Sequence, residues 1–269
     1  MTANWRLGAV FALATLFLLL NASVVGSMVN LWDNSAYQHC YLIPWISLFL
    51  LWEHRHTTLV TEWNGSVWGL IALACSIVVL IAATETQIQV MQHFAVLSGL
   101  VSFIWSLVGD RVLRENWFPL AFLILCLPVG DTLIPILQQI TADLCTLALS
   151  SFGITSYREG MLILLPAGTF EVARACSGFR YLNAGIALGA LFAYFYFRKP
   201  SSMICYVAFV ILTFILMNGC RAFLTILIAA STEMRYMTGE DHIVLGYVLF
   251  LFAAIFVQQV AARFGKLNA

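Results

Sequence analysis

Long apolar runs separated by short polar segments are the feature that most constrains this chain. A helix needs about 20 apolar residues to cross a lipid bilayer. The sequence has eight candidate runs, at residues 8–29, 40–53, 67–84, 90–109, 117–128, 178–197, 203–229 and 243–262. Hydrophobic residues make up 62% of the chain and charged residues only 10%, against roughly a quarter in soluble proteins. We therefore expect an all-α fold, a polytopic transmembrane helical bundle of about eight spans, in which the short second and fifth runs are tilted, extended or re-entrant.

The distribution of basic residues predicts the orientation, because cytoplasmic loops of membrane proteins carry more lysine and arginine. With a cytoplasmic N-terminus, the cytoplasmic side carries Arg6, Arg55, Arg111, Arg114, Arg198, Lys199, Arg263 and Lys266. The other side carries Arg158, Arg174, Arg180, Arg221 and Arg235. We therefore expect both termini in the cytoplasm. We also expect the first apolar run to be retained as a span, because no small-residue cleavage site follows it.

The longest segment on the outer side is 129–175. Apolar residues recur at near-helical spacing over 133–152, which predicts an amphipathic helix lying at the outer membrane surface. The polar face of this helix consists of Gln138, Gln139, Thr141 and Asp143. Glycine and proline interrupt the stretch 154–170, which favours extended structure there. No repeat or low-complexity tract divides the chain, so we expect one integral membrane domain over residues 1–269.

Three polar residues lie at the same predicted depth in the last three spans. Cys176, Arg221 and His242 are each 19–21 residues from the cytoplasmic end of a span. At 1.5 Å per residue, all three lie about 30 Å from the cytoplasmic boundary. The spacing therefore places them together at the outer ends of the spans in 176–263, although depth alone does not bring the helices into contact.

These three side chains suit acyl transfer. A thiol flanked by arginines favours the thiolate, which is the reactive form of cysteine. A histidine can take up and return a proton, and an arginine can hold the oxyanion that develops at a scissile carbonyl. Cys176, Arg221 and His242 are therefore the candidate catalytic residues. Together they indicate peptide-bond cleavage through a thioacyl intermediate, with water or an amine as acceptor.

Each residue also has a structural explanation. A cysteine at the edge of a span is commonly a packing residue, and His242 follows Asp241 at a predicted helix start, where it could simply lie in the interface. Arg221 is harder to explain by packing, because an arginine within an apolar span costs roughly 2.5–3.5 kcal/mol on insertion scales. Arg180 is one turn beyond Cys176 and is either a second cation of the site or a lipid-headgroup anchor.

Two further residues are candidates for substrate binding. Asn218 precedes Arg221 by three residues and is expected on the same helix face. His39 opens the second span on the outer side, where it lines the site or belongs to the interfacial aromatic belt. His54 and His56 have no other evident ligand nearby, so we expect no metal and no cofactor. The sequence also contains no phosphate-binding glycine loop and no basic patch for nucleic acid.

Three sequence blocks carry a family resemblance: residues 175–180 (ACSGFR), residues 218–221 (NGCR), and His242 followed by Gly246 and Tyr247. In order and spacing they resemble the exosortase/archaeosortase family of membrane cysteine transpeptidases. Residues 37–44 and the outer run 128–172 are also similar to parts of that family. Two positions differ, because Arg174 stands where many members have an acidic residue and Cys40 stands where a glycine is usual.

The resemblance implies an activity, a substrate and a location. Cys176 would be the nucleophile, Arg221 the oxyanion or substrate arginine, and His242 the acid/base. The substrate would be a secreted protein with a C-terminal sorting signal of the PEP-CTERM type, which has a Pro-Glu-Pro motif, a transmembrane helix and a basic tail. The enzyme would be a multi-pass protein of the cell inner membrane, would cleave at the periplasmic face, and would pass the product to an amine acceptor of unknown identity.

Three alternatives stay open at this point. A non-enzymatic transporter would use Arg221 and His242 to line a polar pathway, although spans six to eight are nearly purely apolar below their outer third. An assembly component of envelope polysaccharide export would need no chemistry of its own. A hydrolytic intramembrane protease would use Ser177 as its nucleophile.

Overall fold

The computed structural model describes residues 4–233, 235–237 and 241–267. The chain divides into two compact units, Met1–Val129 and Gly130–Ala269. Both units are built mainly from helices, which confirms the predicted helical membrane architecture. The division falls at the beginning of the predicted outer segment 129–175. The expectation of one domain over the whole chain stays a prediction.

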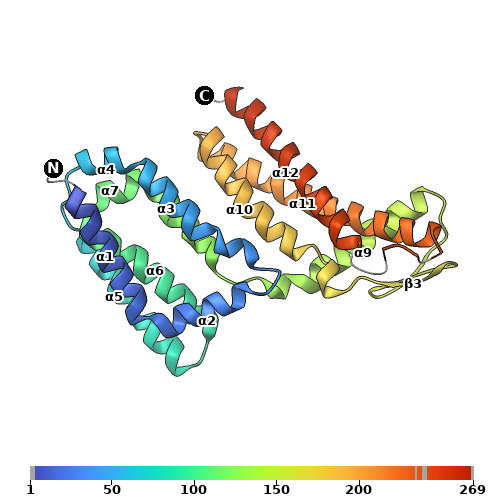
Figure 1. Ribbon diagram of the computed structural model, residues 1–269, viewed down its shortest axis with the longest axis horizontal. Coiled ribbons are helices and arrows are strands. Elements are labelled where there is room, and N and C mark those ends of the chain that lie inside the picture. The colour runs from blue at the N-terminus through green and yellow to red at the C-terminus, as the bar shows by residue number, and fades with distance from the viewer. Residues whose placement is uncertain (1–3, 234, 238–240, 268–269) are drawn as a thin grey trace. The chain divides into compact units, whose positions relative to one another are not determined.

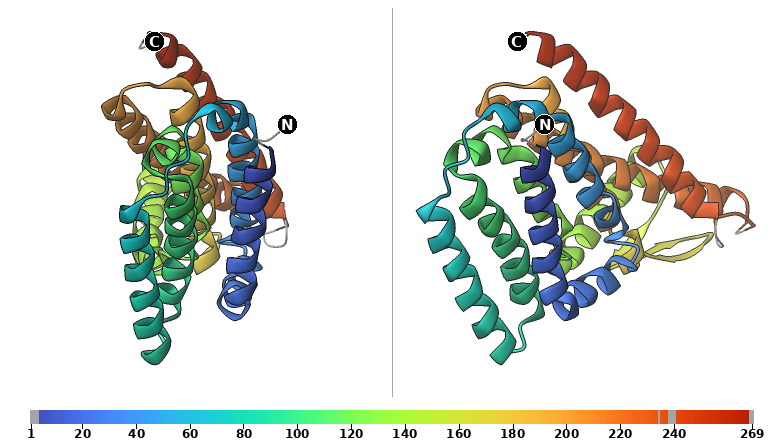
Figure 2. Two further views of the ribbon diagram at one scale, coloured as in Figure 1. Left: turned by 90° about the vertical axis from the view of Figure 1, so that its left-hand side faces the viewer. Right: turned by 60° about the vertical axis from the view of Figure 1, so that its left-hand side comes forward.

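The first unit contains helices and short 3₁₀ turns (Figure 1). In chain order these are α1 (Asn4–Leu20), α2 (Ala22–Trp32), η1 (Gln38–Tyr41), α3 (Ile43–Glu53), α4 (Arg55–Val60), α5 (Val67–Glu85), α6 (Gln89–Val108), α7 (Asp110–Glu115), α8 (Trp117–Phe122) and η2 (Leu123–Cys126). Helices α5 and α6 lie side by side as an antiparallel hairpin (Figure 2). Gly69 permits this close packing, because a Cβ there would lie 2.5 Å from the backbone nitrogen of Ser106.

The first predicted span differs from the observed structure at Asn21. The run 8–29 was expected as one helix, but α1 and α2 meet there at an angle of 84°. The Asn21 side chain donates a hydrogen bond from Nδ2 to the carbonyl of Phe17 at 2.9 Å. Asparagine competes in this way with the backbone bonds of a helix, which favours a break at this position.

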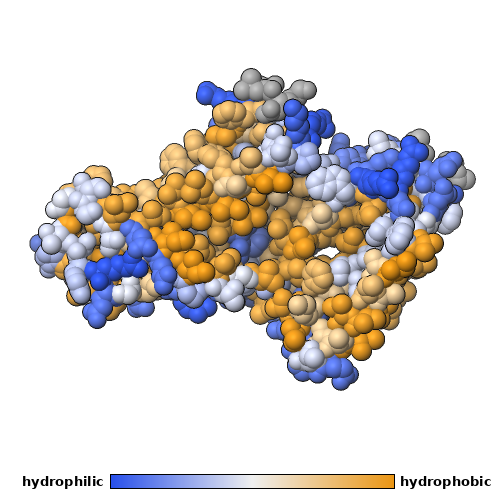
Figure 3. Space-filling view, turned by 180° about the vertical axis from the view of Figure 1, so that it is seen from behind, coloured by the Kyte–Doolittle hydropathy of each residue, from blue (hydrophilic) through white to orange (hydrophobic). Residues whose placement is uncertain are grey.

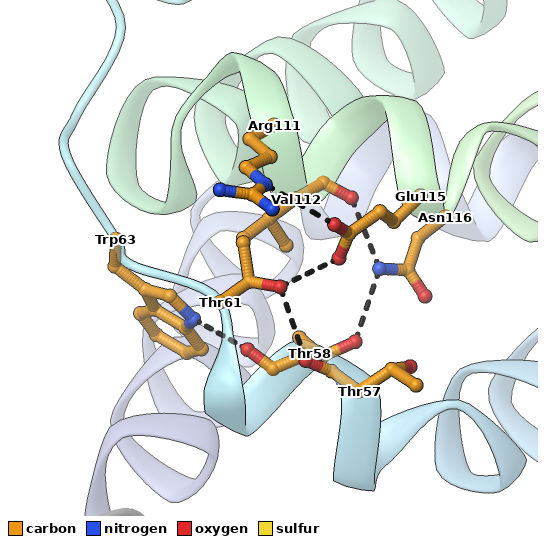
Figure 4. A network of polar contacts seen from close by, with 8 residues as sticks. All are labelled: Thr57, Thr58, Thr61, Trp63, Arg111, Val112, Glu115 and Asn116. Carbon is orange, nitrogen blue, oxygen red and sulfur yellow. Dashed lines mark hydrogen bonds and ion pairs between the residues drawn. The ribbon is translucent and has the colours of Figure 1, made fainter.

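A polar network joins α4 to the end of α7 (Figure 4). Asn116 is 3% exposed, and its Nδ2 donates to Thr58 Oγ1 at 3.0 Å and to the Val112 carbonyl at 3.0 Å. We call this arrangement the Asn116 network. Near it, the ion pair between Arg111 and Glu115 is solvent-exposed and therefore contributes little to stability.

The second unit contains the last three long helices and a small sheet (Figure 1). Its elements are η3 (Asp131–Leu133), α9 (Ile134–Ser151), β1 (Tyr157–Glu159), β2 (Leu162–Leu165), β3 (Gly168–Glu171), η4 (Arg174–Cys176), α10 (Phe179–Tyr196), α11 (Pro200–Ser231) and α12 (Asp241–Leu267). Helices α10, α11 and α12 pack on one another, and α9 packs on α11. The helix expected over 133–152 is α9.

The predicted extended stretch 154–170 forms most of a three-stranded antiparallel sheet in the order β1-β2-β3. Two-residue turns join the strands, and Gly160 supplies the positive φ of +61° that the first turn requires. An ion pair between Arg158 and Asp143 ties β1 to α9. The fold is therefore a helical bundle with one small sheet, a departure from a purely helical chain.

Two hydrophobic clusters hold the second unit together. The first lies among α10, α11 and α12 and includes the fully buried Val210 and Val257. The second joins α9, the sheet and the C-terminal part of α11, with Leu149 and Ile163 fully buried. Tyr181 belongs to the first cluster, and Cys176 packs against the second. The candidate residues of α10 and α11 therefore lie where the two clusters meet.

Much of the molecular surface is apolar, with hydrophilic residues gathered in separate patches (Figure 3). Within the described residues, five helices are long and apolar enough to cross a membrane, or six if the bent pair α1–α2 forms one span. One of the five is the Asp131–Ser151 segment, which contains α9. The count of eight spans, the surface location of α9 and the cytoplasmic location of the termini stay predictions.

Candidate active site

Cys176 ends a tight turn that leads from the sheet into α10. In η4 the Cys176 backbone nitrogen donates to the Ala173 carbonyl at 2.8 Å. Two residues later, Gly178 adopts a φ of +81° at the start of α10, in the left-handed region that favours glycine. The thiol is partly buried and packs against the cluster formed by α9, the sheet and α11.

Asn218 of α11 joins this turn to α9. Its Nδ2 donates to the Cys176 carbonyl at 3.0 Å and to Thr141 Oγ1 at 2.9 Å. Thr141 Oγ1 in turn donates to the Ser177 carbonyl at 3.4 Å. We call these contacts the Asn218 network. Both side chains are buried, at 4% exposed for Asn218 and 2% for Thr141, so water does not compete for these bonds.

Two arginines share one aromatic ring next to this network. The guanidinium carbon of Arg221 lies 5.3 Å from the centroid of the Tyr181 ring, and that of Arg180 lies 5.1 Å from it. Arg180 also donates from Nη2 to Tyr181 Oη at 3.2 Å. Such contacts hold a guanidinium through the negative face of the ring. Arg221 is only 5% exposed.

Neither of these arginines is neutralised within the part of the chain that the structure describes. The ion pairs found there involve Arg111 and Arg158. Nε of Arg221 is buried and has no hydrogen-bond partner among the same residues. A buried guanidinium without a carboxylate partner is suited to receive negative charge from a bound molecule or a reaction intermediate.

Helix α12 approaches Tyr181 at Gly246. A Cβ on Gly246 would lie 2.1 Å from Tyr181 Oη and 3.4 Å from Arg221 Cδ, so only glycine allows this approach. Gly246, Tyr181, Asn218 and Arg221 line one small pocket together with apolar side chains of α11 and α12. His242 lies one turn before Gly246, in the first turn of α12.

The structure thus brings together the turn that carries Cys176, the side chains of Asn218 and Arg221, and Arg180. His242 lies on the helix that borders the same pocket. The connection from Cys176 to Arg221 runs through the cysteine carbonyl and Asn218, and within the described residues the thiol itself forms no hydrogen bond with Arg221. The catalytic roles of Cys176, Arg221 and His242 stay predictions.

His39, the remaining candidate, belongs to η1 in the first unit. Its Nε2 lies 3.7 Å from Cys40 Sγ, and burial lowers the pKa of the imidazole from 6.5 to about 4. Cys40 is fully buried, and its thiol faces the Leu125 carbonyl at 3.5 Å. A role for His39 in substrate binding stays a prediction.

Two residues of the site were not identified from the sequence. Thr141 was recognised only as part of the polar face of α9, and its partner on α11 is 77 residues away. Tyr181 follows Arg180 directly, and nothing in its spacing indicates that two arginines share its ring. Among the described residues, no group of three or more His, Cys, Asp or Glu side chains is arranged to hold a metal ion.

A protein-family model matches most of the chain. The model, described as transmembrane exosortase (Exosortase_EpsH), matches residues 31–258, a range that contains every candidate site residue. The comparisons with curated proteins and with solved structures gave no match.

Proposed function

This chain belongs to the transmembrane exosortase family, and from that premise we propose that it is a cysteine transpeptidase embedded in the inner membrane. Its substrates are secreted proteins with a C-terminal PEP-CTERM-type sorting signal. The observation that carries the proposal is the hydrogen bond from Asn218 to the Cys176 carbonyl. It joins the turn of the partly buried Cys176 to α11, the helix that also carries the buried Arg221.

Cys176 is the nucleophile in this mechanism. Its thiolate attacks the scissile carbonyl, forming a carbon–sulfur bond and a tetrahedral oxyanion. The oxyanion collapses, the carbon–nitrogen bond breaks, and the departing amine takes a proton. The remaining acyl group is held as a thioester on Cys176 until an amine or water attacks the same carbon and frees the thiol.

Arg221 stabilises the oxyanion in this scheme. Its guanidinium is buried and is held by the Tyr181 ring and by packing against α12, so it needs little reorganisation when negative charge develops. Electrostatic stabilisation by preorganised donors is often the largest single contribution to acyl transfer. Arg180 on the same ring adds positive potential, and its partial exposure leaves it able to contact the substrate.

His242 moves the protons. It takes the thiol proton before the attack and delivers a proton to the departing amine, the two steps that general acid–base catalysis requires. Its place in the first turn of α12, one turn from the Gly246 edge of the pocket, supports this assignment.

The substrate approaches within the plane of the membrane. A sorting signal with its own transmembrane helix would bring its cleavage motif to the outer interface, where the predicted topology places Cys176. Helix α9 and the sheet, which pack over the C-terminal part of α11, would shield the thioester from water and favour an amine acceptor. Crosslinking of the substrate helix to the cytoplasmic halves of α10–α12 would contradict this arrangement.

The test is cleavage of a co-expressed reporter that carries a Pro-Glu-Pro-type sorting signal. Cys176→Ala should abolish cleavage, whereas Cys205→Ala, which alters an exposed cysteine of α11, should keep it. Membrane abundance of each variant is measured in the same samples. Cleavage by Cys176→Ala would end the cysteine mechanism, and loss of cleavage in Ser177→Ala alone would favour a serine protease.

A further inference from the structure

We propose that Asn218 and Thr141 are positioning residues for the cleavage reaction. They set the location of the Cys176 thiol by holding the backbone of the turn that carries it. The inference rests on the proposed function. The sequence suggested that Asn218 binds substrate, whereas this proposal assigns it a structural task. The proposal also assigns a role to Thr141, which the sequence marked only as part of a polar helix face.

The hydrogen bonds define the arrangement. Both Nδ2 hydrogens of Asn218 are used, one on the Cys176 carbonyl and one on Thr141 Oγ1. Thr141 then donates its hydroxyl to the Ser177 carbonyl. Two successive peptide carbonyls of the nucleophile's turn are therefore held from two different helices, α11 and α9.

Gly178 makes the arrangement possible. A Cβ at this position would lie 2.4 Å from Cγ of Asn218, so the backbone of the turn lies directly against the amide group. The positive φ of +81° brings the chain into this contact before α10 begins. The side chain of Asn218 therefore touches the turn on either side of Ser177 and restricts how the Cys176 Cα can move.

Position matters because a nucleophile acts only from a narrow range of geometries. A displacement of about 1 Å can lower a rate by about 100-fold. The scissile carbonyl is held independently by Arg221, which lies one turn along α11 from Asn218. A single helix thus carries the residue that holds the nucleophile's backbone and the residue that receives the oxyanion.

The first unit provides an internal control. Asn116 makes the same two bonds from Nδ2, to Thr58 Oγ1 and to the Val112 carbonyl, and is buried to the same degree. No candidate catalytic residue takes part in the Asn116 network. Loss of either network removes the same kind of bonds, but only the Asn218 network touches Cys176.

The experiment compares Thr141→Val, Thr141→Ser and Asn218→Ala with the matched variants Thr58→Val and Asn116→Ala in the full-length protein. Two quantities are measured: kcat and KM for reporter cleavage in detergent, and the rate at which N-ethylmaleimide alkylates Cys176. Mass spectrometry follows the Cys176 peptide, because Cys75, Cys205 and Cys220 are exposed and react as well. The melting temperature of each variant gives its loss of stability.

We expect Thr141→Val and Asn218→Ala to lower kcat by about 10- to 100-fold with KM within about twofold. Alkylation of the partly buried thiol should rise by about threefold or more, because a turn that has lost a hydrogen bond opens more often to the reagent. Thr141→Ser keeps the hydroxyl and should restore both values. Thr58→Val and Asn116→Ala should lose comparable stability but keep the wild-type kcat and alkylation rate.

Wild-type kcat and alkylation in Thr141→Val and Asn218→Ala would overturn the proposal. Equal damage from Thr141→Ser and Thr141→Val would do the same, because it would show a packing role. If the wild type cleaves no sorting signal but the alkylation rates change as expected, Asn218 and Thr141 still set the location of the Cys176 thiol, and the proposed function fails. The two failures are therefore distinguishable.

Discussion

The two units contain the same side-chain arrangement used in different ways. In each, a buried asparagine donates from Nδ2 to a threonine hydroxyl and to a backbone carbonyl, at 2.9–3.0 Å. The carbonyl in the Asn116 network belongs to Val112, four residues earlier in the chain. The carbonyl in the Asn218 network belongs to Cys176, 42 residues earlier.

The difference lies in what each asparagine fixes. The Val112 carbonyl is already held by helical bonding, since the Asn116 backbone nitrogen also donates to it. Asn116 therefore strengthens a helix end that forms locally. The Cys176 carbonyl belongs to a turn between a strand and a helix, where α11 and α9 supply the partners. The same pair of bonds stabilises a local element in one unit and holds the backbone carbonyl of a candidate nucleophile in the other.

The largest effect is expected from breaking the second arrangement with Gly178→Ala. The added methyl group would clash with Asn218. An alanine held at the φ of +81° of position 178 would also add backbone strain of about 1–2 kcal/mol. Reporter cleavage per folded molecule should fall by at least about 100-fold. Gly153→Ala is the matched control, because Gly153 has a φ of +73° but no atom within 4 Å of the added group. A Gly178→Ala variant that cleaves as well as Gly153→Ala would show that the contact with Asn218 does not control the reaction.

A smaller effect is expected when the Tyr181 contact is disturbed by Gly246→Ala. The new Cβ would lie 2.1 Å from Tyr181 Oη, which would shift the ring that holds Arg180 and Arg221. We expect kcat to fall about tenfold, because Arg221, the proposed oxyanion donor, would be displaced by a fraction of an ångström. Gly26→Ala in α2 meets no atom within 4 Å and should slightly raise stability without changing kcat. A wild-type kcat in Gly246→Ala would show that the close approach of Gly246 to Tyr181 is not needed for the reaction.

The smallest effect concerns stability in the first unit and depends on pH. Burial lowers the pKa of His39 to about 4, so between pH 6.5 and about 4 the unfolded chain binds a proton that the folded chain does not. The stability that His39 contributes is therefore complete above pH 6.5 and is lost as the pH falls towards about 4. Thermal unfolding at neutral pH and at about pH 5 should show this decline. His39→Gln should reduce it, whereas His56→Gln, at an exposed position, should leave it in place. A decline of the same size in His39→Gln would assign the titration to other groups.

The helices were predictable because apolar composition and length identify them directly. The predicted span 203–229 became α11 and the predicted span 67–84 became α5, each within a few residues. The break at Asn21 was not predictable, because one asparagine in an apolar run can lie in a continuous helix as well as end one. The pairing of the strands could not be predicted either, because glycine, proline and composition indicate extended structure but not which strand pairs with which.

The contacts of the candidate site could not be predicted from the sequence. Helical rise predicts one level for Cys176, Arg221 and His242, and that level stays a prediction. Helical rise did not reveal the bond from Asn218 to the Cys176 carbonyl, because that bond depends on the left-handed backbone of Gly178. The position of the Tyr181 ring depends likewise on Gly246, because a residue without a side chain lets the ring pack directly against α12. Contacts that depend on one glycine just before α10 and another within α12 leave no pattern in the spacing of residues.

Helix α11 runs without a break for 32 residues. That length is about 48 Å, whereas the hydrocarbon core of a bilayer is about 30 Å thick. The apolar end of α11 beyond Arg221 is covered by α9 and the sheet, so protein replaces lipid around it. The remaining residues 200–221 are about 33 Å long at 1.5 Å per residue, close to the thickness of the hydrocarbon core. We expect a bilayer much thinner or thicker than this length to tilt α11, and so to shift Asn218 and Arg221 relative to a substrate helix of fixed length.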